Sequence, residues 1–325
     1  MNRVAAISPN ITRPLTIGLV FGFLVLLALV FLGDLRQVGQ EVRNFRWSLY
    51  PLVLGLTLFN YALRFVKWHL YLRQTEIHSL PVRESARLFV AGFPLAVTPG
   101  KAGEALKGVW LNQATGKPVA VGIAIVLAER ISDGLAVLAL STLGVIAYPR
   151  YWPAFLLVLL ALTSITAVSQ IRPLALALLA FGERLPLAKR FAHSLRAFYE
   201  SSFVLFQPRM TLLAVGLGTV SWLGEGIGFY LILLGLGLPP GPELLSIAVF
   251  VLAFSTVVGA VSALPGGLGA AEASIASMLA LLLGVETGLA SAATLLIRFA
   301  TLWFGVGLGL LTWALSRQLL GFQKR

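Results

Sequence analysis

Hydrophobic residues along the chain are gathered into long runs that short polar segments separate. A run of about 20 apolar residues is long enough to cross a bilayer as a helix. Six runs reach this length, at 14–33, 49–72, 119–147, 152–170, 209–236 and 288–316. Two other apolar stretches, 84–113 and 243–284, are each interrupted by Pro and Gly near the middle. The pattern predicts an all-α polytopic membrane protein with six spanning helices and two broken helical hairpins.

The amino-acid composition supports this prediction. Of the 325 residues, 58% are hydrophobic and 12% are charged, whereas about 25% of residues are charged in a typical soluble domain. These proportions exclude an ordinary soluble enzyme and a disordered scaffold. Because no polar linker divides the chain, we expect one transmembrane domain over residues 1–325. Its expected parts are a first helix (14–33), repeat one (49–147), a connecting segment (152–207) and repeat two (209–316).

Basic residues outnumber acidic residues, 25 to 13, and most of them lie between the apolar runs. If the N-terminus is cytoplasmic, the cytoplasmic segments hold 16 Lys and Arg, including Lys107 and Lys117, and the external segments hold four. This asymmetry follows the positive-inside rule. We therefore expect a multi-pass protein of the bacterial plasma membrane with both termini in the cytoplasm. The basic loops favour an anionic lipid leaflet as partner and argue against nucleic acid.

The same threading constrains the two broken stretches, because each must cross the membrane an even number of times to keep the basic segment 171–209 inside. A re-entrant hairpin and a pair of short crossing helices both meet this condition. Non-helical backbone at that depth is tolerated where protein or a watery cavity surrounds it. Both arrangements stay open from the sequence, and re-entrant hairpins are the form that we expect.

The two broken stretches are also the core of an internal repeat. The turn residues are Pro99, Gly100 and Gly103 in the first stretch and Pro265, Gly266, Gly267 and Gly269 in the second. Glu104 precedes Arg130 by 26 residues, Glu272 precedes Arg298 by 26 residues, and the two pairs are offset by 168. The threading makes the two units antiparallel. Inverted repeats with interrupted helices are typical of alternating-access carriers.

Ionisable residues inside the apolar segments balance one another. The cations are Arg64, Lys67, Lys101, Arg130 and Arg298, and the acids are Glu104, Glu129, Asp133, Glu225 and Glu272. On the helix 119–147, Arg130 and Asp133 are three residues apart and can pair on one face. Glu129 and Asp133 repel each other, so one must bind a proton or a cation must come from elsewhere. We expect Lys67, near His69, to reach the cytoplasmic interface.

Charged residues inside a membrane protein are costly and are usually functional. Two interpretations apply here: the charges clamp helices together, or they line a polar path. For a lipid head-group path we select Arg64, Lys101, Glu104, Glu129, Arg130, Asp133, Glu225, Glu272 and Arg298. A guanidinium binds phosphate or carboxylate in a bidentate manner. A broken helix directs free N–H groups at an anion, and a glutamate can hold an arginine, an amine or a proton.

Residues 184–207 differ from the other segments, because an apolar stripe is flanked by charged side chains. This pattern predicts a cytoplasmic amphipathic helix in the membrane interface, with an anchoring role or, alternatively, a gating role. Enzyme chemistry is poorly represented in the sequence. The chain has no cysteine, two aspartates, three histidines without metal-ligand spacing and no nucleotide-binding GxxxxGK[ST] loop. We expect no metal, no cofactor and no enzymatic activity.

With these motifs in view, the chain resembles the lysylphosphatidylglycerol synthase transmembrane-region family, which is also described as flippase-like. The resemblance rests on PGKAGE (99–104), ERISD (129–133), PGGLGAAE (265–272) and Arg298, and it extends over about 14–316. It implies a lipid flippase. In bifunctional relatives this module moves aminoacylated phosphatidylglycerol to the outer leaflet, and a soluble C-terminal domain makes that lipid. We expect a standalone form without that domain, and such relatives are associated with hopanoid export or lipid-linked sugar steps.

Translocation of a polar-headed lipid is therefore the leading hypothesis. An anionic or aminoacylated phospholipid and a prenyl- or hopanoid-linked lipid are the candidate substrates. A secondary transporter of a small soluble solute shares the inverted repeat and is the first alternative. A non-transporting membrane subunit is the second, since faces such as Gly305-x-x-x-Gly309 pack helices closely. A second copy of the chain or a lipid-synthesising enzyme would be its partner.

Overall fold

The computed structural model describes residues 12–98, 103–147, 152–173 and 192–316. Within these ranges the secondary structure is helical and includes no strand. The predicted turn and pathway residues Pro99, Gly100 and Lys101 lie outside the described residues, as does the 184–191 part of the predicted amphipathic helix.

Helices outside the two repeats form the start of the chain and the connection between the halves. They are α1 (Thr12–Leu32), α2 (Leu35–Asn44), η2 (Trp47–Leu49), α7 (Trp152–Gln170) and α10 (Ala192–Leu205). The first half contains α3 (Tyr50–Gln74), α4 (Val82–Ala91), η3 (Phe93–Val97), α5 (Leu106–Thr115) and α6 (Val119–Ala147). The second half contains α11 (Pro208–Gly235), α12 (Pro242–Val261), η6 (Pro265–Gly267), α13 (Ala270–Leu283), α14 (Thr287–Arg298), η7 (Phe299–Trp303) and α15 (Phe304–Leu315).

The two halves share one order of elements. In each, a long helix is followed by a hairpin of two helices and then by a second long helical segment. The final segments, α6 and the run from Thr287 to Leu315, both contain 29 residues. Their first residues are 168 positions apart, and so are their last residues. The offset that the sequence indicated for two charged pairs therefore also holds for helix boundaries.

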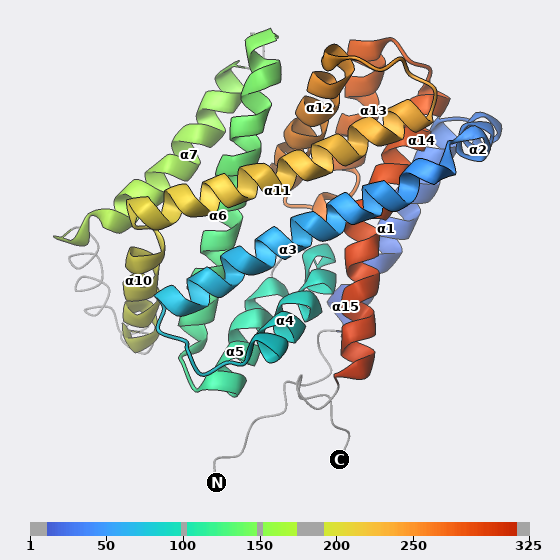
Figure 1. The fold of residues 1–325 in the computed structure, drawn as a ribbon. Helices are drawn as coiled ribbons and strands as arrows, with labels where there is room; N and C mark the ends of the chain where they lie inside the picture. The colour runs from blue at the N-terminus through green and yellow to red at the C-terminus, as the bar shows by residue number, and fades with distance from the viewer. Residues whose placement is uncertain (1–11, 99–102, 148–151, 174–191, 317–325) are drawn as a thin grey trace.

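The long helices α3 and α11 are antiparallel and in close contact (Figure 1). Where α3 begins, the backbone N–H of Arg46 donates to the carbonyl of Gly235 at the end of α11, at 3.0 Å. Farther along, the Ser221 hydroxyl donates to the carbonyl of Asn60 at 3.2 Å. Residue numbers thus rise along one helix while they fall along the other. The predicted inversion of the two halves is confirmed.

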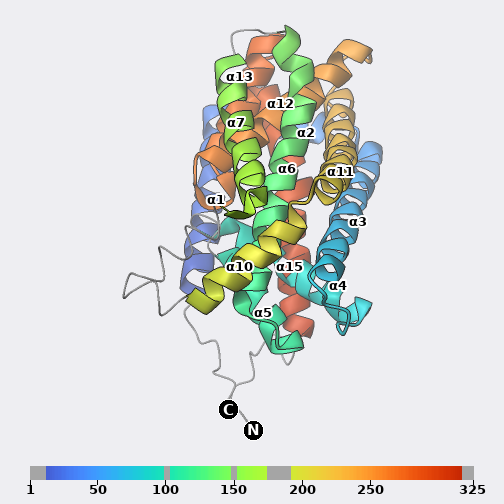
Figure 2. The ribbon, with the colours of Figure 1, turned by 90° about the vertical axis from the view of Figure 1, so that its left-hand side faces the viewer.

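The two hairpins approach from opposite ends of the bundle, with α4 and α5 at one end and α12 and α13 at the other (Figures 1 and 2). Their turns meet: Val97 in η3 and Leu268, directly after η6, belong to one buried cluster. A β-carbon on Gly22, the middle residue of α1, would lie 3.0 Å from Leu268. The 21 residues of α1 correspond to about the thickness of a bilayer core. The hairpin turns therefore lie beside the middle of a membrane-length helix.

The second turn needs glycine for two separate reasons. Gly266 and Gly267 have positive φ angles of 63° and 69°, which residues with a side chain rarely adopt. A β-carbon on Gly267 would also lie 2.9 Å from the backbone of Gly259. The predicted break at 265–269 is confirmed, and it allows two helices of the hairpin to approach closely.

The predicted span 288–316 is one helical run with an irregular turn near its middle. It is a regular α-helix up to Arg298 and then a π-helix, η7, over five residues before α15 begins. Two hydroxyl groups of α3 bind carbonyls in this region: Tyr50 donates to Leu296 at 3.2 Å and Tyr61 donates to Thr301 at 2.6 Å. Single π turns inside α-helices are rare and are frequent at functional sites.

Six helical segments of the described chain are long and apolar enough to cross a membrane. They are Arg13–Leu32, Trp47–Gln74, Pro208–Gly235, Pro242–Val261, Pro265–Leu283 and Thr287–Leu315. Four of them coincide with predicted spans, and two are the limbs of the second hairpin. α6 and α7 match the predicted spans 119–147 and 152–170 in extent. The limbs of the first hairpin, α4 and α5, have only 10 residues each, about half of a membrane thickness.

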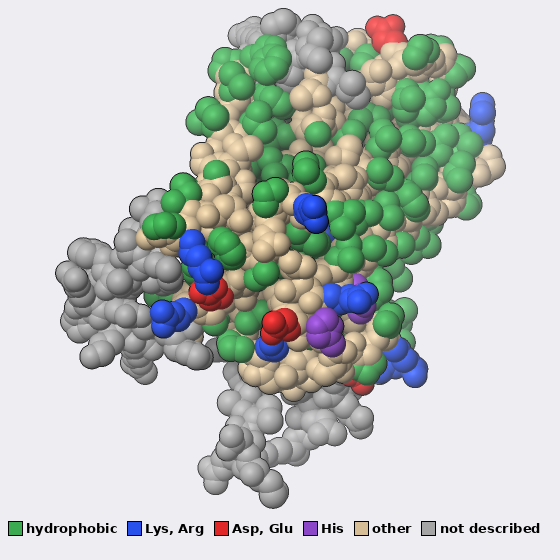
Figure 3. All heavy atoms as spheres, turned by 60° about the vertical axis from the view of Figure 1, so that its left-hand side comes forward, with side chains coloured by type: hydrophobic (Ala, Val, Ile, Leu, Met, Phe, Trp, Pro, Cys, Tyr) green, Lys and Arg blue, Asp and Glu red, His purple; other side chains and the backbone are tan. Residues whose placement is uncertain are grey.

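Hydrophobic side chains cover much of the face seen in Figure 3, and charged side chains gather toward its lower part. Leu157 on α7 and Leu212 on α11 are 72% and 73% exposed. Apolar surface of this extent is expected where lipid surrounds a protein. These observations establish a multi-pass membrane protein.

The described part of the amphipathic segment, α10, packs against α6. Its last residue, Leu205, is buried, whereas Leu195 is exposed. The amphipathic character of this segment and its place in the membrane interface stay predictions.

Candidate functional site

Each half contains an ion pair between the glutamate that follows its Pro-Gly turn and an arginine on its final helical segment. In the first half, Arg130 Nε donates to Glu104 Oε2 at 2.7 Å, and Arg130 Nη2 bonds the other carboxylate oxygen. In the second half, Arg298 Nε donates to Glu272 Oε1 at 2.5 Å. The two 26-residue separations thus have one structural cause, because each arginine ties a hairpin to a long helix.

The second pair also organises the hairpin turn. The other oxygen of Glu272 accepts the backbone N–H of Gly269 at 2.7 Å and so caps the N-terminus of α13. Arg298 Nη2 donates to the carbonyl of Gly266 at 3.3 Å. The pair therefore joins the turn, the start of α13 and the end of α14.

A threonine shapes the described part of the first turn. The hydroxyl of Thr98 accepts the backbone N–H of Gly103 at 3.0 Å and donates to the carbonyl of Leu95 at 2.6 Å. These bonds close the loop that leads to Glu104. Thr98 therefore joins the two described ends of the first turn.

Asp133 on α6 is the centre of a second group of charges. Lys67 bonds one of its oxygens and also donates to Ser132 at 3.1 Å. Arg64 lies 3.4 Å from the other oxygen. The expectation that Lys67 reaches the interface is wrong, because its side chain is completely buried. The helix spacing allowed Arg130 to pair with Asp133, but the ion pairs of Asp133 are with α3.

Lys107 on α5 neutralises the remaining acid of α6. Its Nζ lies 2.8 Å from Glu129 Oε2 and 4.4 Å from the ring centre of Trp68. Lys107 is 9% exposed, so it is a buried helix residue and not a loop charge, and its side of the membrane stays a prediction. The predicted need for a cation near Glu129 and Asp133 is confirmed: Lys107 serves the first, and the cations of α3 serve the second.

Glu225 lies at the crossing of α11 and α3 and is buried. It interacts electrostatically with Arg64, Arg298 and Asp133. Close by, Asn60 is completely buried, and neither polar atom of its side chain has a hydrogen-bond partner. Buried polar groups normally have partners. Sequence reasoning missed Asn60, and its place one helical turn before Arg64 was the available signal.

The charged groups follow one another through the protein, by ion pairs within each half and by longer-range electrostatic interactions of Glu225 between the halves. Arg130 interacts with Glu104, Glu129 and Asp133. Asp133 interacts with the cations of α3, and Glu225 extends the series to Arg298. Arg298 in turn binds Glu272. The ion pairs Arg130–Glu104 and Arg298–Glu272, here called the clamps, are therefore linked through the interface of α3, α6 and α11.

The three arginines of this series are more accessible than the acids paired with them. The side chain of Arg130 is 37% exposed, that of Arg64 17% and that of Arg298 14%. The side chains of the acids paired with them are 1–7% exposed. Among the described residues, the acidic and histidine side chains form no group suited to hold a metal ion. The arrangement presents guanidinium groups, with carboxylates behind them.

Comparison with protein families gives one match, to the family described as lysylphosphatidylglycerol synthase TM region, over residues 16–309. The chain belongs to this family. The match includes both hairpins and both arginine–glutamate clamps. No curated protein and no solved structure is similar enough to count as a match. The resemblance noted from the sequence is confirmed, and membership in the lysylphosphatidylglycerol synthase TM-region family implies a function related to membrane lipids.

In this member of the lysylphosphatidylglycerol synthase TM-region family, eight of the nine predicted pathway residues belong to the charged series, and the ninth, Lys101, lies outside the described residues. The series also includes Lys67 and Lys107, which sequence reasoning had assigned elsewhere. The side chains thus come together as a set, and their role in binding a lipid stays a proposal.

Proposed function

We propose that this protein is a translocase that moves a polar-headed lipid between the leaflets of a membrane. The observation that carries the proposal is the series of accessible guanidinium groups, which extends from the clamp of one hairpin to the clamp of the other. An anionic or aminoacylated phospholipid and a prenyl- or hopanoid-linked lipid are the candidate substrates. Membership in a lipid-related membrane family supports this class of substrate.

The chemistry of the series suits a phosphate-bearing head group. A guanidinium can exchange a carboxylate for a phosphate with little change in geometry, because both accept two parallel N–H bonds. Arg130 already forms such a bidentate bond with Glu104. We propose that the glutamates occupy the arginines when the path is empty and release them when a head group arrives. An aminoacyl group would donate its ammonium to the released carboxylate.

The geometry of the first hairpin supports a re-entrant loop in this proposal. The turns of the two hairpins meet beside the middle of α1, and the helices of the first hairpin are about half a membrane in length. The N-terminus of α13 lies at this meeting point and carries a partial positive charge. A head group would therefore find cations and a helix N-terminus near the bilayer centre, where an uncompensated charge costs most.

We propose transport rather than catalysis, because the interior carboxylates paired above serve cations instead of forming a reactive group. The test uses purified protein in vesicles of phosphatidylethanolamine and phosphatidylglycerol that contain a fluorescent head-group-labelled lipid. Dithionite destroys the label in the outer leaflet, so translocation appears as a second phase of quenching. Faster quenching of an anionic, aminoacylated or prenyl-linked lipid than in empty vesicles is the expected result. Equal rates with all of them would reject a translocase.

The orientation is a separate proposal. Both termini on the cytoplasmic side of a bacterial plasma membrane would follow from the excess of Lys and Arg in the loops at one end. Since the chain has no cysteine, single cysteines at Ser79 and Glu286 can be labelled with an impermeant maleimide in intact cells. Labelling of the Glu286→Cys variant alone is the expected result, and labelling of the Ser79→Cys variant alone would reverse the assignment.

A further inference from the structure

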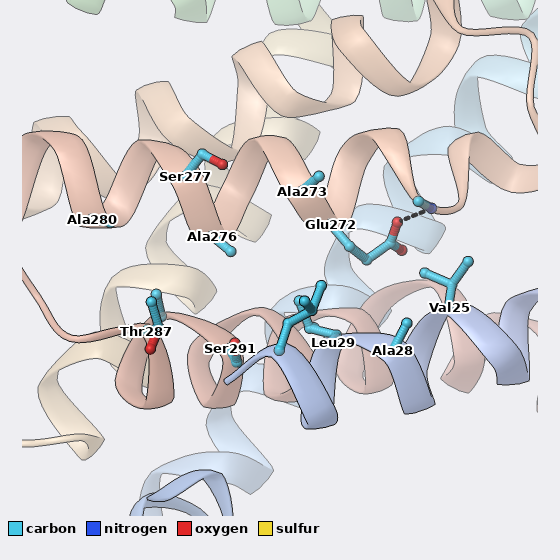
Figure 4. A pocket seen from close by; sticks show the side chains of 13 residues that line it. Val25, Ala28, Leu29, Glu272, Ala273, Ala276, Ser277, Ala280, Thr287 and Ser291 are labelled. Atoms are coloured by element: carbon cyan, nitrogen blue, oxygen red, sulfur yellow. Dashed lines mark hydrogen bonds between the residues drawn. The ribbon is translucent and has the colours of Figure 1, made fainter. Parts of the chain in front are cut away.

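A groove of about 400 Å³ lies between α1, α13 and α14 (Figure 4). One wall is aliphatic and comes from α1, and the other comes from α13 and contains small residues. Ala28 on the first wall and Ala273 on the second are both exposed, so the groove opens sideways at the surface. Its volume lies within the range of ligand pockets in proteins.

Polarity changes along this groove. Glu272, which holds Arg298, lines one end, next to Val25 and Gly269. A β-carbon on Gly269 would lie 3.8 Å from Val25, three residues beyond the midpoint of α1. The other end, beside Ala280, carries no charged side chain, and the hydroxyl-bearing residues Ser277, Thr287 and Ser291 also line the groove. The charged end therefore lies near the middle of α1, and the uncharged end lies near its C-terminus.

The length of the groove matches one leaflet. The wall of α13 extends from Gly269 to Ala280, which is about 17 Å at 1.5 Å per residue. Half of a bilayer core is about 15 Å. Most of the lining is apolar and offers water few hydrogen-bond partners. The hydrocarbon chain of a phospholipid fits both its length and its lining.

The polarity of the groove is opposite to that of a phospholipid in its leaflet. A phospholipid at rest in its leaflet has its head group at the surface and its chain ends at the bilayer centre. The groove has the opposite arrangement, with charge near the centre and mostly apolar walls toward the surface. It therefore suits a lipid whose head group has moved inward while its chain still points to the surface.

We infer that the groove holds one acyl chain of a phospholipid in transit, with its head group at Arg298 and Glu272. The inference rests on the proposed translocase function and adds a place for the chain. Arg298 would bind the phosphate, because a guanidinium matches its oxygens. Glu272 has acceptor capacity beyond its two present bonds, to Arg298 and to Gly269, and could take a donor of the head group.

The experiment uses phosphatidylglycerol with a photoactivatable diazirine at the end of one acyl chain, in vesicles of phosphatidylethanolamine and phosphatidylglycerol. After illumination, mass spectrometry of proteolytic fragments locates the adducts. Adducts at the surface end of the groove, near Leu32 and Ala280, are the expected result, because the chain end points outward there. Adducts confined to residues at the level of the hairpin turns would overturn the inference.

Two variants fill the groove from opposite walls, Ala273→Trp and Ala28→Trp. Each should lower the adducts at the surface end roughly tenfold, the change expected when about two buried methylene groups lose their contacts. The matched control is Ala161→Trp, since Ala161 is an exposed alanine on α7 and its replacement should leave the adducts unchanged. Equal labelling in all three variants would overturn the inference. Thermal unfolding of each variant verifies that it is folded.

Flux measured on the same preparations separates this inference from the proposed function. Groove adducts without flux would support the chain site and reject translocation. Flux without groove adducts would support translocation and overturn the chain site.

Discussion

Arg298 and Glu272 are 26 residues apart in the chain, and their side chains form an ion pair that closes the turn of the second hairpin. Arg130 and Glu104 have the same separation and form the corresponding pair in the first half. In both halves, which have opposite orientations, an arginine–glutamate ion pair thus attaches the hairpin to the final helical segment.

Replacement of the clamp arginines should stop transport. We expect Arg130→Ala and Arg298→Ala each to lower flux roughly tenfold to a hundredfold, because charged hydrogen bonds contribute about 1.5–3 kcal/mol. Flux in vesicles is the measurement. The double variant Arg298→Ala with Glu272→Gln removes the unpaired carboxylate and should restore stability without restoring flux.

The control for the clamps is Arg172→Ala, since Arg172 is exposed and pairs with exposed Glu200. Its flux should equal that of the unmodified protein. Normal flux in both clamp variants would remove the arginines from the site.

Lys67 should be a structural residue, because its charge is fully buried beside Asp133. Lys67→Met leaves Asp133 with Arg64 as its remaining ion-pair partner and should destabilise the protein by about 3–5 kcal/mol. Adding Asp133→Asn should recover part of the loss. The midpoint of thermal unfolding in detergent should be highest for the unmodified protein, lower for the double variant and lowest for Lys67→Met. Lys117→Met, at a pair whose side chains are 37% and 84% exposed, should change stability by about 0–1 kcal/mol.

Gly267 should tolerate no side chain. Gly267→Ala places a β-carbon 2.9 Å from the backbone of Gly259 at a positive φ, so we expect a loss of more than about 1 kcal/mol. The control Gly216→Ala lies in α11 with open space around the new carbon and should be neutral or stabilising by about 0.5–1 kcal/mol. Equal unfolding midpoints for the two variants would contradict the close packing of the second turn.

Glu225 should regulate how tightly an anionic head group binds. It is the acid that interacts with both Arg64 and Arg298, so Glu225→Gln should make this region more positive. We expect an anionic phospholipid to bind roughly three- to tenfold more tightly and to be translocated more slowly. Binding isotherms and flux measure the two effects. Glu243→Gln, at an exposed glutamate of α12, should change neither, and a weaker Kd in Glu225→Gln would contradict the assignment.

The inverted architecture could be predicted because it produces several sequence patterns that can be recognised. Long apolar runs, two Pro-Gly breaks and two equal spacings of Glu and Arg are all visible without coordinates. The second break is confirmed at η6, and the opposite directions of α3 and α11 are confirmed by the hydrogen bonds between them. A repeat constrains many positions at once, which makes its prediction robust.

Partners within the charged series were less predictable, because they depend on how helices rotate against one another. Helix spacing placed Arg130 near Asp133, yet the fold provides Glu104 for the first and two cations of α3 for the second. Lys107 lies in the first broken stretch, and the charge count placed it with the cytoplasmic Lys and Arg. Only the folding of α5 against α6 brings it to Glu129.

The π turn η7 distinguishes the two halves, although both have the same order of elements. α14 is fastened to the second hairpin through Arg298, whereas α15 packs against α4 and η3 of the first hairpin. The helical run from α14 to α15 therefore contacts both hairpins, and η7 lies between the two contact regions. Its counterpart α6 has no such turn among the described residues. If one hairpin rotated relative to the other, the helical run would bend at η7. The corresponding helix α6 would stay straight.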